Sequence, residues 1–250
     1  MKDAITLSYV NMFAVLKVLE VLCETDDEAK RIVSCKPISI GLRVIGGPKA
    51  TLSFGNGKCT MTQGAHGRIK LLLTSPEHFN QMVDGKKNPI PYWGFTQLKF
   101  LLKDFTRLTE ILTRYLKASK QDLEDRDFFE RSTKLMLHVV ANALSVIGGH
   151  DELGAYSLKS IPDGVISMEI VDSAYANIVV ENGVMTTYNT RAESPRSYMI
   201  FKNYDVARGL FDGTAEAMSC LARGDMMMKG YIPMIDNLNR ILSRVAVYLA

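Results

Sequence analysis

The chain has 250 residues, of which 47% are hydrophobic and 23% are charged, and this balance excludes a disordered protein. Its formal net charge is +3. Acidic and basic residues interleave, so the composition indicates no basic face and no nucleic-acid partner. The four cysteines, Cys23, Cys35, Cys59 and Cys220, form no C-x-x-C pair. Their spacing favours inert thiols in a reducing cytosol over a disulfide framework.

The N-terminal segment lacks the pattern of a secretory signal. Lys17 and Glu20 interrupt the apolar run over residues 10–23, and no small-residue cleavage site follows it. No uninterrupted apolar segment approaches the roughly eighteen residues that a membrane span needs. We therefore expect a cytoplasmic protein without stable membrane insertion.

The first half of the chain alternates helix and strand signals. An apolar stripe predicts a helix over residues 7–23, and strict alternation predicts a strand over 38–44. Asn56-Gly57 predicts a hairpin, because both residues tolerate a positive φ. A strand over 68–74 follows, and then a helix that Ser75-Pro76 begins and Gly85 ends. A long helix is predicted over 95–116, with one apolar face made of Leu98, Leu101, Leu102, Phe105, Leu108, Leu112 and Leu116.

The second half repeats these landmarks in the same order. Asn56-Gly57 corresponds to Asn182-Gly183, Asp84-Gly85 to Asp212-Gly213, and Asp27-Glu28 to Asp151-Glu152, all at separations of 124 to 128 residues. The chain is therefore interpreted as an internal duplication. We expect an α+β fold of two tandem related units, each a mainly antiparallel sheet covered by helices. The predicted units are 1–117 and 132–250, joined by a charged linker over 118–131.

The two copies differ near their ends. The second copy continues with a strand from Tyr198, a helix that Gly213 ends and a helix that Gly224 ends. A methionine-rich strand up to Gly230 and a terminal helix over 231–248 follow. The first copy has only residues 86–93 in place of the second helix and the strand, a segment too short and too proline-rich for both. We expect this copy to serve as a scaffold, and its ability to hold a ligand is doubtful.

Several short segments of the second half resemble the sterol carrier protein family, the type-two lipid-transfer domain. They are Phe201-Lys-Asn-Tyr-Asp205, Leu210-Phe-Asp-Gly213, the run from Met218 through Arg223-Gly224-Asp225, and Lys229-Gly230. The segment Ala176–Gly183 is similar to that family's strand-turn-strand hairpin, and the resemblance covers residues 163–250. It implies non-enzymatic binding or transfer of an apolar ligand, such as a fatty acyl chain, a sterol or an isoprenoid, in a hydrophobic cavity of the second unit. The alternative is a structural or oligomerisation module with a filled core.

The sequence contains no catalytic motif that we can identify. The histidines His66, His78, His138 and His150 are scattered, so we expect no metal site, no cofactor and no catalytic residues. His150-Asp151-Glu152 is interpreted as a charged helix start, and Cys220 as a core residue rather than a nucleophile.

The methionines of the second unit have two interpretations: they fill the core, or they form an adaptable pocket wall. The sequence does not determine which face of the methionine strand is interior. A homo-oligomer is also compatible with the sequence. Arg240 and Arg244 are interpreted as a solvated face, with pairing to a ligand carboxylate as the alternative. The predicted ligand-lining residues are Phe201, Leu210, Phe211, Met218, Leu221, Met226, Met228, Met234, Leu238 and Ile241.

Overall fold

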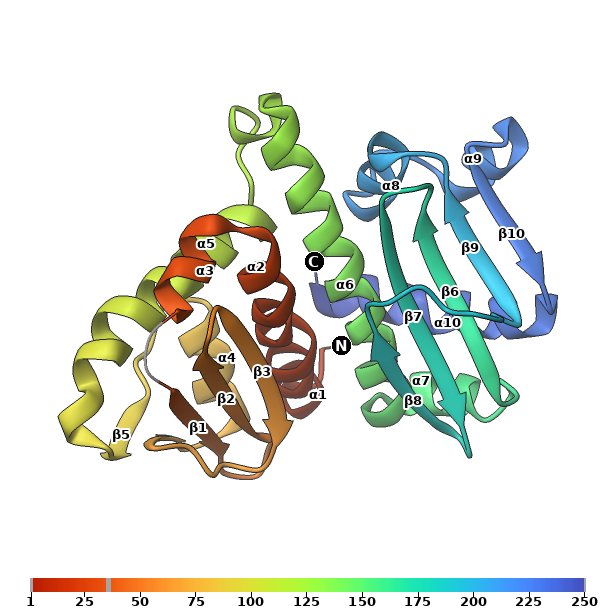
Figure 1. The fold of residues 1–250 in the computed structure, drawn as a ribbon. Coiled ribbons are helices and arrows are strands. Elements are labelled where there is room, and N and C mark those ends of the chain that lie inside the picture. Colours follow the sequence, from red (N-terminus) through yellow and green to blue (C-terminus); the bar gives the residue numbers. More distant parts are fainter. Residues whose placement is uncertain (1, 35–36, 250) are drawn as a thin grey trace. The chain divides into compact units, whose positions relative to one another are not determined.

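The computed structural model of the chain describes residues 2–34 and 37–249, so the prediction for Cys35 lies outside the described residues. The chain divides into two compact units, residues 1–125 and 126–250, which are described separately (Figure 1). The segment predicted as a linker has structure of its own. Residues Asp122–Glu124 form a short 3₁₀ helix, η5, and the first helix of the second unit already begins at Arg126.

The first unit begins with a continuous helical segment from Ala4 to Thr25. Its parts are α1 (Ala4–Val10), the π-helical turn η1 (Asn11–Val15), the 3₁₀ turn η2 (Leu16–Val18) and α2 (Leu19–Thr25). By length and composition this segment could cross a membrane, which differs from the expectation that no segment is long and apolar enough. More than half of its apolar window is buried within the unit, and the Glu20 carboxylate accepts a hydrogen bond from Met61 N (2.6 Å), as in the core helix of a soluble protein.

The sheet of the first unit has five strands in the order β3-β2-β1-β4-β5. Only the pair β1 and β4 is parallel, and the other neighbours are antiparallel, which confirms the mainly antiparallel sheet. Asn56 and Gly57, with φ of 54° and 74°, form the predicted hairpin turn. The strands are β1 (Ile38–Val44), β2 (Lys49–Gly55), β3 (Lys58–Gln63), β4 (Ile69–Leu73) and β5 (Ile90–Trp93).

Two predictions for the end of this unit need correction. The segment over residues 86–93 does keep the edge strand β5, and it lacks only the helix, because a proline is tolerated on an edge strand. The predicted long helix is divided into η3 (Phe95–Gln97), the π-helical η4 (Phe100–Phe105) and α5 (Thr106–Leu116). The wider π turn shifts the phase of the apolar stripe, so Leu102 is 72% exposed instead of sharing the buried face.

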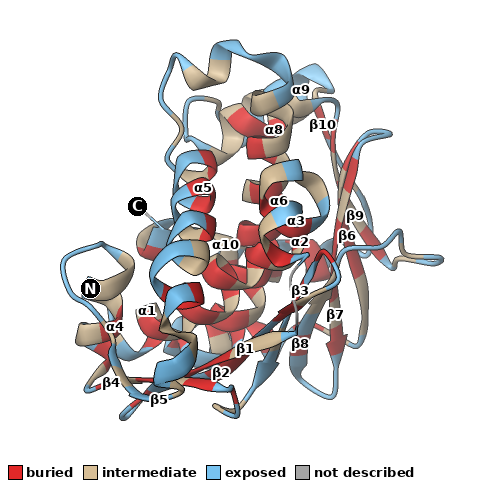
Figure 2. Cartoon of the chain, turned by 60° about the vertical axis from the view of Figure 1, so that its left-hand side comes forward, coloured by how far each residue is buried: buried red, intermediate tan, exposed pale blue. Residues whose placement is uncertain are grey.

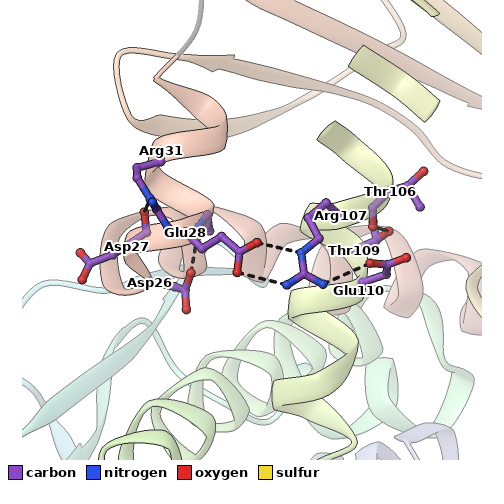
Figure 3. Close-up of polar contacts among 9 residues, drawn as sticks. Asp26, Asp27, Glu28, Arg31, Thr106, Arg107, Thr109 and Glu110 are labelled. Carbon is purple, nitrogen blue, oxygen red and sulfur yellow. Dashed lines mark hydrogen bonds and ion pairs between the residues drawn. The ribbon is translucent and has the colours of Figure 1, made fainter. Parts of the chain in front are cut away.

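The remaining helices of the first unit are α3 (Asp27–Val33) and α4 (Pro76–Val83). Asp26 caps α3 by accepting from Ala29 N (2.8 Å), and Ser75 caps α4 as predicted, by accepting from His78 N (3.2 Å). Arg107 of α5 forms a two-pronged ion pair with Glu28 of α3, at 2.8 and 3.1 Å (Figure 3). This pair is exposed, so its contribution to stability is small.

The second unit repeats the topology of the first. Written in the same direction as the first sheet, its strand order is β8-β7-β6-β9-β10, and only the pair β6 and β9 is parallel. The strands β6 to β10 therefore correspond to β1 to β5 one by one. The described part of the first unit has no counterpart of the helix Ala217–Arg223, α9, between its last two strands. The elements are α6 (Arg126–His150), α7 (Glu152–Leu158), β6 (Gly164–Ile170), β7 (Ala174–Glu181), β8 (Val184–Tyr188), β9 (Ser197–Phe201), α8 (Tyr204–Phe211), α9 (Ala217–Arg223), β10 (Met226–Gly230) and α10 (Ile232–Leu249).

The core of each unit lies between its helices and one face of its sheet. Residues at alternate strand positions, such as Ile40 and Leu42 or Ile166 and Met168, are fully or almost fully buried there. In Figure 2 α6 is largely buried, whereas α9 is mainly exposed. The helix that distinguishes the second unit is therefore also one of its least buried helices.

Candidate ligand-binding site

The methionine strand turns one face to the interior of the second unit. Met226 lies opposite Phe201 and Met228 opposite Met199 in the antiparallel pair of β10 and β9. Met226 is buried and Met228 is half-buried, whereas Met227 between them is 42% exposed. The alternation of the strand therefore makes the even-numbered methionines the interior ones.

The helix α8 covers the end of this wall. The rings of Phe201 and Phe211 contact each other edge to face, with their centroids 5.7 Å apart. Asn203 begins α8 by accepting from Val206 N (3.0 Å), which repeats the cap of Ser75 on α4. Leu210, Phe211 and Leu221 are half-buried on α8 and α9.

The helix α10 contributes a fully buried row made of Met234, Leu238 and Ile241. Ser197 Oγ lies 3.5 Å from Met234 Sδ, and Ile241 packs against Gly148 of α6. This end of the interior is occupied by the protein's own side chains.

Nine of the ten predicted lining residues are thus buried or half-buried on β9, β10, α8, α9 and α10. Met218 is the exception, because its side chain is 70% exposed on α9, and it does not line the interior. Helical periodicity alone did not fix its direction, since a seven-residue helix has too few positions to define an apolar face. None of the ten residues lines either of the two pockets found on the outer faces of the sheets.

The interpretation of Arg244 as a solvated side chain, or as a clamp for a ligand carboxylate, is wrong. Its guanidinium donates to both carboxylate oxygens of Asp151, at 3.0 and 2.8 Å. Asp151 also caps α7 by accepting from Gly154 N (3.0 Å), which confirms the helix start predicted there. The hydrogen bonds from Arg244 lower the pKa of Asp151 to about 2. Arg240 is paired with Asp236 on the exposed side of α10 (3.2 Å).

Buried polar side chains between α6 and β8 were not predicted from the sequence. Asn142 Oδ1 accepts a hydrogen bond from Thr187 Oγ1 of β8 (2.5 Å). One turn earlier, His138 is buried and its Nδ1 has no hydrogen-bond partner within the described residues. Burial lowers the pKa of His138 to about 4, so this imidazole is neutral at physiological pH.

Each sheet also carries a pocket on the face away from its helices. In the first unit a pocket of about 430 Å³ is lined by Arg43, Lys49, Gly64, Ala65, His66, Lys70 and Tyr92. In the second unit a pocket of about 310 Å³ is lined by Glu169, Arg191, Ala192, Glu193 and Tyr198. The first pocket is lined in part by the connection between β3 and β4, and the second by the connection between β8 and β9.

In each unit a side chain of the second strand forms hydrogen bonds with the backbone of the connection that lines the pocket. In the first unit Thr51 Oγ1 donates to Gly64 O (2.6 Å) and accepts from His66 N (2.9 Å). At the matching position of the second unit, Asn177 Nδ2 donates to Thr190 O. The duplication thus preserves a polar residue on the second strand that fastens this connection.

A metal centre and a reactive nucleophile would be the other kinds of site among the described residues. No group of three His, Cys, Asp or Glu side chains in residues 2–34 and 37–249 is placed to hold a metal ion. Cys220 is buried in α9 and contacts only weakly the guanidinium of Arg223 (3.7 Å). The strongest candidate site is therefore the apolar wall of β10, α8 and α10.

Neither a protein-family model nor a curated protein sequence significantly matches the chain. Solved structures do match. The chain is similar in fold to sterol carrier protein domains. The sterol carrier protein domain 2 of Helicoverpa armigera matches with a TM-score of 0.37 and 12% identity, over 45% of this chain and 89% of that one.

Two further sterol carrier protein structures match over a similar length. A UbiJ-SCP2 ubiquinone synthesis protein has a TM-score of 0.34 and 14% identity, over 43% of this chain and 95% of that one. A sterol carrier protein 2 crystal structure has the same TM-score and identity, over 44% and 92%. Each match covers about the length of one unit.

Proposed function

We propose that the second unit binds one apolar molecule, such as a fatty acyl chain, a sterol or an isoprenoid, and carries it without chemical change. The observation that carries this proposal is the unfinished burial of the apolar wall. Leu210, Phe211, Leu221 and Met228 are half-buried and adjoin the fully buried residues of β9, β10 and α10. A ligand seated there would complete the burial of all four side chains.

The element that would move to admit the ligand is α9. It has seven residues, no side-chain cap at its N-terminus and a glycine in the left-handed region on either side, Gly213 and Gly224 (φ of 69° and 73°). Short, uncapped and mainly exposed helices open at low cost in free energy. The described part of the first unit has no counterpart of α9, which supports the proposal that the first unit serves as a scaffold.

Apolar burial is sufficient for useful affinity. A chain of about sixteen carbons gains roughly 0.8 kcal/mol per buried methylene, or about 12 kcal/mol in total. Association and ordering cost about 4–15 kcal/mol, and at the low end of this cost the remaining gain of about 8 kcal/mol corresponds to micromolar affinity. Methionine side chains suit ligands of different shape, because they are unbranched and polarizable. No catalytic group is required, and the proposed place of action is the cytoplasm.

Displacement of a fluorescent fatty acid tests this function with the full chain. We expect saturable binding of the probe and its release by an unlabelled fatty acid or sterol. A signal that does not saturate, or that unlabelled lipids do not displace, would remove the proposal.

The second candidate is a structural module with a filled core. It is favoured by the row Met234, Leu238 and Ile241, which the protein's own side chains already bury. Such a module would act through contacts with other chains, so its mass in analytical ultracentrifugation would rise with concentration. A concentration-independent monomer that binds the probe would exclude this alternative.

A further inference from the structure

The outer face of the first sheet differs in charge from its counterpart. From Pro37 to Pro76, a stretch that contains β1 to β4, the sequence has no Asp or Glu, and its Lys and Arg residues are Arg43, Lys49, Lys58, Arg68 and Lys70. The corresponding stretch from Asp163 to Tyr204 has five acidic and three basic residues. The expectation that the chain has no basic face is therefore wrong, because the chain-wide charge of +3 combines a basic first half (18 basic and 13 acidic residues) with a slightly acidic second half (12 basic and 14 acidic residues).

These cations gather on one surface. Arg43, Lys49 and Lys70 line the pocket of about 430 Å³, together with His66. Within the described residues, none of the three cations lies within ion-pair distance of a carboxylate. The equivalent pocket of the second unit contains Glu169 and Glu193 instead. We call the surface of Arg43, Lys49, His66 and Lys70 the basic face.

Large apolar side chains flank the basic face at the edge strand β5, which Figure 1 shows at the end of the first sheet. Tyr92 is exposed and lines the same pocket as Lys70. Trp93 is 64% exposed, lies opposite Lys70 in the strand pair, and has the Lys70 ammonium 5.9 Å from its ring centroid. Ile90 and Phe95, on either side of this pair, are exposed as well.

We propose that the basic face and the exposed side chains of β5 form a docking surface for a membrane that contains anionic phospholipids. Lys and Arg near such a membrane are attracted to its negative surface potential. Trp and Tyr prefer the boundary between lipid headgroups and acyl chains, where an apolar ring and a polar tip are both satisfied. The exposed Ile90 and Phe95 find apolar surroundings at the same depth. Docking is peripheral and needs no spanning segment.

A nucleic acid fits this surface less well. Bases stack on free aromatic faces, but the ammonium of Lys70 already lies over the Trp93 ring. Nucleic acid would also leave the aliphatic side chain of Ile90 without an apolar partner. The docking surface belongs to the first unit alone and does not depend on the apolar ligand site of the second unit.

The chain carries its own probe, because Trp93 is its single tryptophan. We expect the Trp93 emission to shift to shorter wavelength with vesicles of phosphatidylcholine containing about one-third phosphatidylserine, and not with phosphatidylcholine alone. Added salt should reverse the shift, because it screens the attraction between the basic face and the lipids.

Reversing two charges of the basic face is a second test of membrane docking. The double variant Lys49→Glu with Lys70→Glu should weaken co-sedimentation with the anionic vesicles by roughly thirtyfold or more. The control, Lys159→Glu with Lys229→Glu in the second unit, changes the net charge equally and should bind as the unaltered chain does. Circular dichroism of both variants checks that they fold.

Three outcomes would overturn the proposal. One is the absence of a Trp93 shift with anionic vesicles, and another is equal weakening in both double variants. The third is saturable binding of a single-stranded oligonucleotide without binding of vesicles, which would assign the basic face to nucleic acid.

Discussion

Tyr115 donates a hydrogen bond from its hydroxyl to the carboxylate of Asp26, at 2.9 Å. Tyr248 donates in the same way to Asp151, at 3.0 Å. In each unit the aspartate caps the short helix that precedes the sheet, and the tyrosine belongs to the last α-helix, α5 or α10. The sequence comparison aligned Asp27 with Asp151, one residue away from the pair that the structure matches. The duplication thus preserves a bond that fastens the last helix of each unit to a helix cap.

Removing either hydroxyl should destabilise its own unit. We expect Tyr248→Phe and Tyr115→Phe each to lower the free energy of unfolding by about 1–2 kcal/mol, because a hydrogen bond to a charged group is lost. Urea unfolding followed by circular dichroism measures the change. Phe13→Tyr, which adds a hydroxyl elsewhere, serves as a comparison for the optical signal. Unchanged midpoints in both Phe variants would show that these bonds contribute nothing.

The ion pair of Arg244 and Asp151 predicts an acid-sensitive step. The pKa of Asp151 is about 2 in the folded chain and about 3.9 when unfolded, so the folded state holds the ionised form. This contribution, about 2 kcal/mol, is complete above pH 4 and disappears as the pH falls towards 2. Asp151→Asn should lose it at neutral pH and show a flatter dependence in that window. Thermal melts between pH 5 and pH 2 provide the measurement, and parallel curves for both proteins would contradict the assignment.

His138 predicts a separate step at milder pH. Its pKa is about 4 in the folded chain and 6.5 when unfolded, so the unfolded state takes up the proton first. Stability should therefore decrease as the pH falls from 6.5 to 4, by up to about 3 kcal/mol. His138→Gln should remove this slope while keeping a polar side chain. Thermal melts between pH 7 and pH 4 measure the slope, and the same slope in His138→Gln as in the unaltered chain would contradict the assignment.

Adjacent methionines on β10 should differ in ligand binding. Met228→Gln places an amide on the interior face and should weaken binding of a fluorescent fatty acid at least about tenfold, because an unpaired polar group is buried against the ligand. Met227→Gln changes the exposed face of the same strand and should bind as the unaltered chain does. Equal affinities in the two variants would move the ligand away from β10.

Gly67 lies where the connection between β3 and β4 crosses β1. A Cβ at this position would be 2.1 Å from Gly41 N, closer than any side chain can approach. Gly67→Ala should therefore destabilise the first unit by at least about 2 kcal/mol. Gly149→Ala, whose Cβ would meet nothing within 4 Å, should be neutral or slightly stabilising. Thermal melts of both variants compare the two effects.

Much of the fold could be predicted because its signals are local. The turn at Asn182-Gly183, the cap at Ser75 and the helix end at Gly213 depend on φ angles and hydrogen bonds within a few residues. The repeat of such signals at one spacing made the duplication visible, and the matched strand orders of the two sheets agree with it.

The remaining features depend on residues far apart in the chain. The partner of Arg244 is 93 positions away, so no spacing rule could identify it. The exposure of Leu102 follows from a π turn, and the retention of β5 despite Pro91 follows from its place at a sheet edge. The basic face was hidden by an average over two units of opposite character.

Native mass spectrometry of the freshly purified full chain tests the central claim most directly. Our account predicts a population heavier than the 27.9 kDa polypeptide by the mass of one lipid, which organic extraction removes and identifies. The bare polypeptide mass, both before and after incubation with fatty acids and sterols, would contradict it.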